Sequence, residues 1–229
     1  MLNKTLLPQS VAREIQSMIQ SGSLKPGEKI PSQREFSQRF GISRASLREA
    51  LLTLETLGLL KTEAGRGTFV SGGAPSASNH MGPWRYSDSY SVFDVFQTRI
   101  MLEGQMASLA AGRLTANQLD QMEKMTQQME QGWAQQDLLA NVDADLEFHA
   151  IIASACSNAM LRALYQTVRD QLTATQRQPI PITDPARMRE SIAEHRRIIS
   201  ALSANDPAGA RLQMETHIRN TARCAGLEP

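Results

Sequence analysis

The sequence predicts a mainly helical protein whose two parts follow different patterns. Up to residue 72, short helical stretches lead to a glycine-rich turn, whereas from residue 92 apolar residues recur at steps of three and four almost to the end. Residues 73–91 carry few large apolar side chains, which is typical of a linker. We therefore expect domains at 1–72 and 92–229, and 229 residues with 41% hydrophobic content are enough for two small cores.

The first part carries signals for three helices. Apolar residues at helical spacing predict a helix over 10–19. Ser32 can cap a helix that runs to Arg39, and Ser43 can cap a longer one that ends near Leu57, with Gly41 as the stop between them. The last two helices are close enough in sequence to form a helix-turn-helix.

A hairpin with a glycine-rich tip is expected next. Short apolar runs at 59–62 and 68–70 flank a turn at 63–67, which predicts two strands. Helices followed by such a hairpin make the winged helix-turn-helix order. At the tip, Gly65 allows the backbone to approach DNA closely, and Arg66 is suited to the minor groove or to a phosphate.

Basic and hydroxyl side chains gather where such a motif reads DNA. Arg44 and Arg48 lie one turn apart at the start of the third helix, opposite its apolar face, where a recognition helix contacts base edges. Ser43 and Ser46 are short donors beside them, and Arg34 on the preceding helix can reach the same groove. The alternative is a solvated face paired with neighbouring glutamates; the coincidence of the arginines with the motif and the wing favours DNA.

The second part is predicted to be an all-α bundle. Asp184-Pro185 and Asp206-Pro207 each place a capping acid before a proline suited to the first helical position, and Thr115 and Asp137 can cap two further helices. The expected helices span residues 92–111, 116–133, 138–156, 158–176, 185–203 and 207–224.

Several classes of protein are excluded by composition. No run of about 18 apolar residues is present, so we expect no membrane span, and the N-terminus lacks the apolar segment of a secretory signal. Cys156 and Cys224 form neither a disulfide framework nor a CxxC pair. We therefore expect a cytoplasmic protein.

Four residues of the predicted bundle form a candidate metal site. Asp145 and His149 are four residues apart, so both project from one face of one helix. His195 and His217 lie in the middle of the last two helices, from which inward imidazoles can complete the site. The alternative is that each histidine is a surface or hydrogen-bonded core residue, and spacing alone leaves both interpretations open. One carboxylate and three imidazoles suit Zn²⁺, Ni²⁺ or another divalent first-row ion.

Arg99 is a second candidate functional residue, and the alternative is that it only forms an ordinary salt bridge with Glu103 at i+4.

A metalloenzyme built on the four candidate ligands is a competing class of protein. Four protein ligands leave little room for activated water, and Glu194 points about 100° away from His195, so it is a poor general base. A bundle that only dimerises is a third possibility.

Two stretches resemble known families. The segment PGEKIPSQREFSQRFGISRASLREALLTLETLGLLKTEAGRGTFV resembles the N-terminal domain of the GntR family of bacterial transcription regulators. The segments FQTRIMLEGQMASLAAGRLT and ADLEFHAIIASACSNAMLRAL resemble the FCD type of effector domain. Gln33 and Ala45 depart from the usual GntR residues, which puts only fine operator preference in doubt.

The resemblance implies a ligand-responsive regulator that binds palindromic operator DNA as a homodimer, more often a repressor than an activator. It implies DNA contacts by Arg34, Ser43, Arg44, Ser46, Arg48 and Gly65. It also implies a metal ion, Zn before Ni or Mn, on Asp145, His149, His195 and His217, and a carboxylate or sugar-acid effector on Arg99, with Asp143 and Asn158 as lesser candidates.

The near-neutral net charge of +1 conceals a division. Residues 1–72 hold 10 Lys and Arg against 6 Asp and Glu, a formal +4, and the remainder holds 14 against 17, a formal −3. A basic part of this size suits DNA, and a dimer doubles it.

Overall fold

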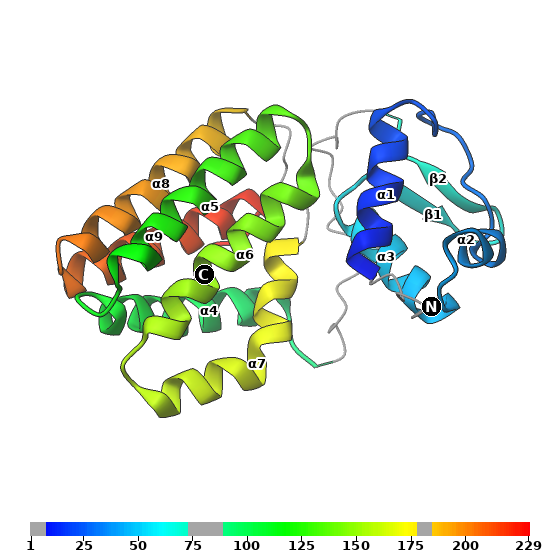
Figure 1. Cartoon of the computed structure of the whole chain (residues 1–229). Coiled ribbons are helices and arrows are strands. Elements are labelled where there is room, and N and C mark those ends of the chain that lie inside the picture. Colours follow the sequence, from blue (N-terminus) through cyan, green and yellow to red (C-terminus); the bar gives the residue numbers. More distant parts are fainter. Residues whose placement is uncertain (1–7, 73–88, 178–184) are drawn as a thin grey trace, which may run out of the picture. The chain divides into compact units, whose positions relative to one another are not determined.

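The computed structural model describes residues 8–72, 89–177 and 185–229, and these form two units, each with its own core. The predicted linker falls mostly on residues 73–88, which lie outside the described residues. The N-terminal unit consists of α1 (Pro8–Gln20), α2 (Gln33–Phe40), α3 (Arg44–Thr56), β1 (Leu60–Glu63) and β2 (Gly67–Val70) (Figure 1). The prediction of a helix-turn-helix followed by a hairpin is confirmed.

The turn between α2 and α3 is built from capping residues. Ser32 forms a capping box with Glu35, because the Ser32 hydroxyl accepts the Glu35 N–H and the Glu35 carboxylate accepts the Ser32 N–H. Gly41 ends α2 in the left-handed region at φ 65°, which glycine adopts without strain. The Ser43 hydroxyl then accepts the N–H of Ser46 and begins α3. These local bonds fix where the exposed face of α3 starts.

The hairpin is tied to α3. β1 and β2 are antiparallel, with Leu60 opposite Val70 and Glu63 opposite Gly67. The Glu55 carboxylate of α3 accepts hydrogen bonds from the backbone N–H and the hydroxyl of Thr62. The unit closes on a core of apolar side chains from all three helices and both strands: Val11, Ile15, Phe36, Leu47, Leu51, Leu54, Leu57, Leu60 and Val70.

The C-terminal unit contains six helices in its described part. They are α4 (Val92–Ala110), α5 (Ala116–Ala134), α6 (Leu138–Ala155), α7 (Ala159–Arg177), α8 (Pro185–Ser203) and α9 (Pro207–Cys224). All six begin and end within two residues of the predicted limits, and the all-α prediction is confirmed.

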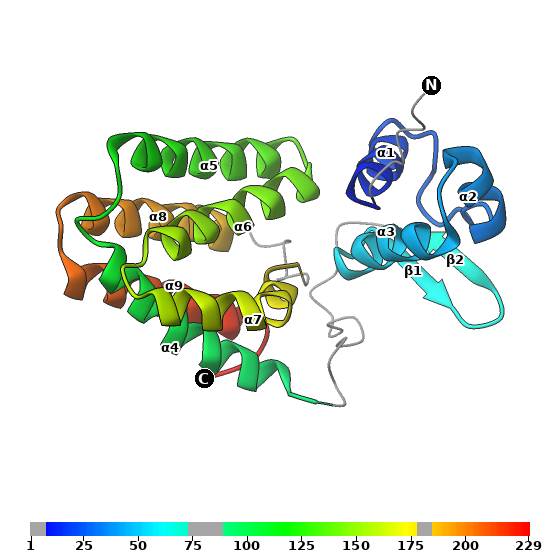
Figure 2. The ribbon, with the colours of Figure 1, turned by 60° about the horizontal axis from the view of Figure 1, so that its bottom comes forward.

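Five of these helices close a ring. α4 packs against α9 and α6, α9 packs against α8, and α5 packs against both α8 and α6 (Figures 1 and 2). The side chains inside the ring are mainly apolar, with Phe148, Met122, Ile198 and Ile218 fully buried. Leu172 and Tyr165 of α7 are buried against α4 and the end of α6. Within the described residues, no helix is both long and apolar enough to cross a membrane.

Candidate metal centre and nucleic-acid interface

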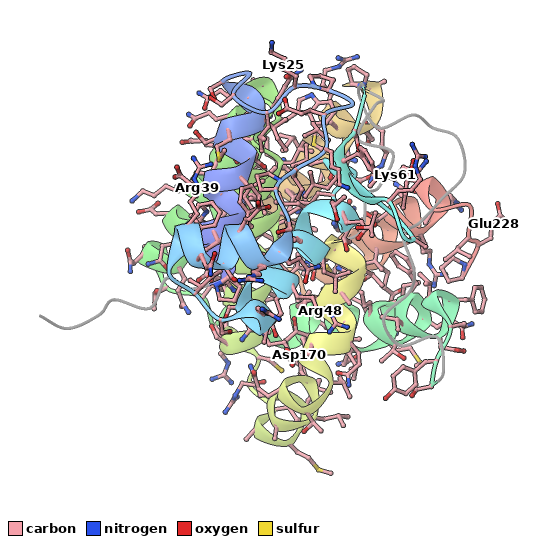
Figure 3. All side chains as sticks on the ribbon, turned by 90° about the vertical axis from the view of Figure 1, so that its right-hand side faces the viewer. Lys25, Arg39, Arg48, Lys61, Asp170 and Glu228 are labelled. Carbon is pink, nitrogen blue, oxygen red and sulfur yellow. The ribbon has the colours of Figure 1, made fainter. Side chains whose placement is uncertain are left out.

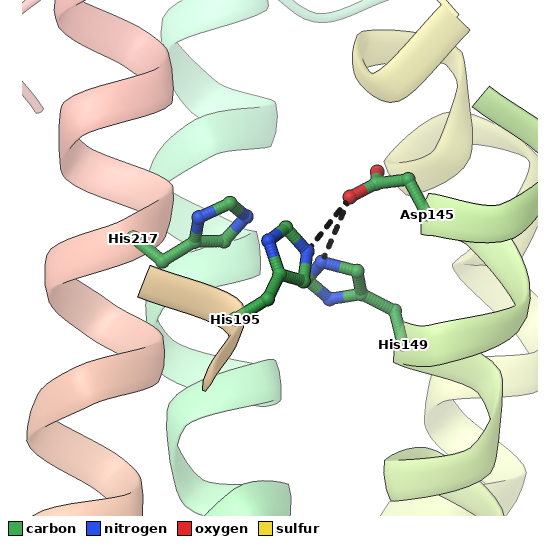
Figure 4. A group of neighbouring side chains, drawn as sticks. All are labelled: Asp145, His149, His195 and His217. Atoms are coloured by element: carbon green, nitrogen blue, oxygen red, sulfur yellow. Dashed lines mark hydrogen bonds and ion pairs between the residues drawn. The ribbon is translucent and has the colours of Figure 1, made fainter. Parts of the chain in front are cut away.

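Four potential metal ligands meet inside the ring of helices. Asp145 and His149 come from successive turns of α6, His195 from α8 and His217 from α9 (Figure 4). The three histidines are buried and Asp145 is partly buried. One ligand atom from each residue lies within 4.8 Å of the others, whereas two atoms bound to one ion at about 2.1 Å are at most about 4.2 Å apart. The four ligand atoms are therefore gathered almost closely enough to share one ion.

The hydrogen bonds of the three histidines fix which nitrogen is available. His149 Nδ1 lies 2.5 Å from Glu103 Oε2, His195 Nδ1 lies 2.8 Å from the Ser191 carbonyl oxygen, and His217 Nδ1 lies 2.8 Å from Glu194 Oε2. Each partner is an acceptor, so each Nδ1 carries the proton and donates it. In the neutral ring, each Nε2 then presents a lone pair, as a metal ligand requires.

Two of the three Nε2 atoms, those of His195 and His149, lack a suitable partner within the described part of the chain. His195 Nε2 lies 3.0 Å from Asp145 Oδ1, which places two acceptors in contact unless a cation or a second proton lies between them. His149 Nε2 is 3.8 Å from the same oxygen and is buried without a hydrogen-bond partner among the described residues. A second proton on His195 would leave His149 Nε2 unpaired, whereas a shared cation satisfies both. The donor set of this site thus fits a divalent first-row ion.

The electrostatics favour an ionised Asp145 and a neutral His217. Burial acts to raise the pKa of the Asp145 carboxyl, but the hydrogen bond with His195 and the interaction with His149 outweigh it and hold that pKa well below its usual range. Burial and the neighbouring His195 lower the pKa of His217 to about 4. An ionised carboxylate beside a neutral imidazole is the state that binds a metal without first losing protons.

Arg99 forms the salt bridge with Glu103 that the sequence offered as its alternative role, but the pair is buried. Arg99 is 1% exposed, and its Nε donates to Glu103 Oε1 at 2.7 Å. Burial acts to raise the pKa of Glu103, but the interactions with Arg99 and His149 outweigh burial and lower this pKa to about 2. Because Glu103 also accepts a hydrogen bond from His149, a single carboxylate connects Arg99 to the candidate metal ligands.

Glu194 supports His217 in the same way, and the sequence analysis missed it. Its Oε2 accepts from His217 Nδ1, and Arg187 donates two bonds to the same carboxylate, at 3.0 and 2.9 Å. Asn220 donates a further bond at 2.7 Å. Burial raises the pKa of Glu194, but His217 and Arg187 outweigh it and lower it to about 2. Adjacent residues of a helix are rotated by about 100°, which made Glu194 a poor general base beside His195. The same rotation directs the Glu194 carboxylate toward His217 of α9.

The end of α7 supplies two more polar residues that no spacing signal indicated. Thr175 Oγ1 accepts a bond from Arg99 Nη1 at 3.2 Å and donates to the Leu172 carbonyl. Gln176 Nε2 donates to Asp145 Oδ2 at 2.9 Å. This helix therefore contacts both Arg99 and a candidate metal ligand.

The two lesser effector candidates lie elsewhere. Asn158 is exposed, and its side-chain oxygen accepts the Leu161 N–H at the start of α7. Asp143 is two residues from Asp145, so it points to another side of α6, and it is half-buried. Asn158 thus acts as a helix cap, and its assignment to the effector site is not supported by its position.

The predicted DNA-contacting residues lie at the start of α2, in and just before the first half of α3, and at the tip of the hairpin. Arg34, Arg44 and Arg48 are exposed, and Arg48 is labelled in Figure 3. Arg44 and Arg48 form no hydrogen bond or ion pair with the residues that the structure describes. The Ser43 and Ser46 hydroxyls are 2.9 Å apart at the start of α3, which leaves them at the same end of the helix as the arginines.

The hairpin tip carries the remaining two residues. Gly65 is exposed with φ 72°, a conformation that favours glycine, so the turn itself requires this residue. Arg66 is exposed, pairs with Glu63, and has its guanidinium 5.6 Å from the centre of the Phe69 ring. Its ion pair is exposed and therefore weak enough to exchange for a phosphate.

A winged helix-turn-helix unit together with a helical unit that carries inward imidazoles defines a DNA-binding transcription regulator with a separate sensor-type domain. Residues 7–70 match the model of bacterial regulatory proteins of the gntR family, and residues 94–220 match that of the FCD domain. The chain belongs to the gntR family and carries an FCD domain.

Relatives that match this chain over most of its length agree with this assignment. The Uxu operon transcriptional regulator of Escherichia coli K12 is 28% identical over 218 residues, which cover 93% of this chain and 84% of the relative. The HTH-type transcriptional regulator LutR of Bacillus subtilis 168 is 30% identical over 207 residues, covering 89% and 94%. The solved structure of E. coli McbR/YncC shares the fold, with a TM-score of 0.54, 21% identity and coverage of 97% and 98%. The Uxu and LutR relatives are both named as transcriptional regulators, which confirms that class over the metalloenzyme.

Proposed function

We propose that this protein is a homodimeric, metal-containing repressor that a small organic acid releases from its operator. Residues 1–72 bind DNA, 73–91 link the two parts, and 92–229 bind the effector and dimerise, in the cytoplasm. The observation that carries the proposal is the convergence of Asp145 with three imidazoles whose Nδ1 protons are all held by acceptors.

Zinc is the proposed ion, with nickel and manganese as competitors. Imidazole nitrogens together with a carboxylate oxygen are the ligands that Zn²⁺ prefers in proteins, and Mn²⁺ prefers sites richer in oxygen. A bound divalent ion supplies a positive centre that attracts a carboxylate oxygen. His149, His195, His217 and Asp145 hold it, and Glu103 and Glu194 orient two of the imidazoles.

Arg99 is the proposed clamp for the effector's carboxylate. Its three bonds to Glu103 and Thr175 leave further N–H groups of the guanidinium for an incoming anion. A carboxylate held by Arg99 near a bound ion would be attracted by both positive charges, which favours organic acids over neutral compounds. Asn158 is not part of this proposal.

The proposed response is a difference in binding free energy between two arrangements of the dimer. Two copies of α3 insert Arg44 and Arg48 into successive major grooves, with Arg34, Ser43, Ser46, Gly65 and Arg66 as supporting contacts. The effector prefers the arrangement in which the two DNA-binding domains no longer match the half-site spacing, so operator affinity falls.

One experiment on untagged protein tests these claims together. The protein selects its operator from random DNA, metal content is measured by mass spectrometry, and anisotropy follows release by a panel of carboxylates. We expect about one ion per chain, loss of the ion in His149→Ala, and release by at least one acid. Glu147→Gln, an exposed position on the same helix, is the matched control. Protein that contains no metal and ignores both chelator and Zn²⁺ refutes the metal claim, and a bundle that only dimerises predicts release by no acid.

A further inference from the structure

Gln176 at the end of α7 holds Asp145 with one half of its amide and leaves the other half without a partner. The side chain is buried, with 6% of the residue exposed. Its Nε2 donates to Asp145 Oδ2 at 2.9 Å, and its Oε1 is buried with no hydrogen-bond partner among the described residues.

The orientation of this amide is fixed by Asp145. An ionised carboxylate only accepts hydrogen bonds, so Nε2 must face it and Oε1 must face away. Asp145 Oδ1 is directed at His195, so the carboxylate divides its two oxygens between the imidazoles and Gln176. Gln176 therefore cannot rotate its amide to satisfy Oε1 without breaking its bond to Asp145.

Gln176 also stands next to the residue that contacts Arg99. The hydroxyl of Thr175 is already committed, since it donates to Leu172 and accepts from Arg99. Thr175 contacts Arg99 and Gln176 contacts Asp145, so an acid bound between Arg99 and the candidate metal ligands would lie next to this turn of α7. A buried acceptor without a donor is costly, and a ligand that brings an O–H group recovers that cost.

We propose that Gln176 is a specificity-determining residue that selects hydroxy acids over the corresponding plain acids by accepting a hydrogen bond from the ligand's hydroxyl group. The inference rests on the proposed effector site and adds to it the class of acid. A site that is built to bond a hydroxyl discriminates strongly against the analogue that lacks it, because its buried acceptor is then left unpaired. A metal-bound water is the other source of an O–H donor, and it predicts no such discrimination.

Matched pairs of acids test the proposal by calorimetry on metal-loaded protein. L-lactate is compared with propanoate, and D-gluconate with 2-deoxy-D-gluconate, so that each pair differs by one hydroxyl. We expect the wild type to bind the hydroxy acid of at least one pair about tenfold more tightly or better. Gln176→Met removes both bonds, and Gln176→Lys keeps an N–H donor for Asp145 while it removes the acceptor. Both variants should bring the ratio of affinities within a pair close to one.

The ratio within a pair is insensitive to general damage, because both acids meet the same protein. Gln166→Met, an exposed glutamine of the same helix, should keep the wild-type ratio. Equal binding of both members by the wild type overturns the inference, and so does a ratio that survives in both Gln176 variants. Binding of neither member of either pair overturns the proposed effector site itself, which is a different result.

Discussion

Replacing Glu194 with glutamine tests whether the buried carboxylate that accepts the His217 hydrogen bond supports the candidate metal site. The carboxylate, 2% exposed, accepts four hydrogen bonds: two from Arg187, one from His217 and one from Asn220. A glutamine of the same shape keeps one acceptor oxygen and turns an NH₂ group toward donors. At least one partner must therefore lose its acceptor, and His217 also loses the anion that holds its Nδ1 proton.

The expected loss follows from these contacts. Removing the hydrogen-bonding partner of a metal-ligating histidine typically lowers metal affinity about 10- to 100-fold, or about 1.4 to 2.7 kcal/mol. The buried donors left unpaired lower the free energy of unfolding by about 1–3 kcal/mol in addition.

Zn²⁺ affinity is measured by competition with a chromophoric chelator, and folding is checked by circular dichroism. Glu190→Gln on the same helix is the control, because that carboxylate is 54% exposed and its ion pair with Arg197 contributes little. Folded Glu194→Gln protein that binds Zn²⁺ as tightly as the wild type would falsify the role given to this carboxylate.

Four further predictions concern the rest of the molecule. Arg44→Ala and Arg48→Ala should each weaken specific operator binding by about 1–3 kcal/mol in a footprint titration, and unchanged footprints contradict the assignment of α3. Arg99→Lys keeps a charge for Glu103 but loses the fork, so operator affinity should stay while release by the acid weakens at least tenfold; a normal response excludes Arg99 as the clamp. Chelation should lower the melting temperature, because a metal ion whose free concentration is 100 times its dissociation constant stabilises the folded protein by about 2.7 kcal/mol. Equal melting temperatures with and without chelator oppose a bound ion. Gly132→Ala should lower the free energy of unfolding, measured in urea, by about 1–3 kcal/mol, because the added Cβ would lie 2.9 Å from the Asn141 backbone nitrogen. Gly72→Ala is the control, since a Cβ there meets no atom within 4 Å, and equal effects of the two substitutions contradict the packing argument.

The parts of the fold that the sequence predicted are those with local signals. Ser32, Ser43, Thr115 and Asp137 all cap helices as expected, because a cap depends on residues three positions away. The pairing of Asp145 with His149 is equally local, since it needs only one turn of one helix. The bounds of the helices and the mainly helical class followed from signals of this range.

The supports of the candidate site depend on contacts between helices and left no such signal. Glu194 was set aside because it points away from His195, but α9 packs against α8 on that side and brings His217 to it. Gln176 reaches Asp145 across 31 positions of sequence, and Glu103 reaches His149 across 46. The sequence offered Arg99 either an ordinary salt bridge with Glu103 or a role in binding an effector. The structure shows the salt bridge, which is buried and continues through Glu103 to His149, a connection that the spacing of Arg99 and Glu103 cannot reveal. Metal binding itself stays a prediction.

Two chains of the same kind, Arg99–Glu103–His149 and Arg187–Glu194–His217, approach the cluster from different helices, yet they are not equivalent. Glu194 is also held by Asn220, and its arginine has two bonds to it of normal length. Glu103 has one short bond from Arg99 and one of 3.5 Å, and Arg99 is the residue proposed to bind the acid. An anion that draws the Arg99 guanidinium toward itself would therefore weaken the Arg99–Glu103 bonds and act on His149, whereas Glu194 keeps its own bonds from Arg187 and His217. Because coupling between two binding sites is reciprocal, an acid that binds Arg99 must change the affinity for the ion by the same factor as the ion changes the affinity for the acid.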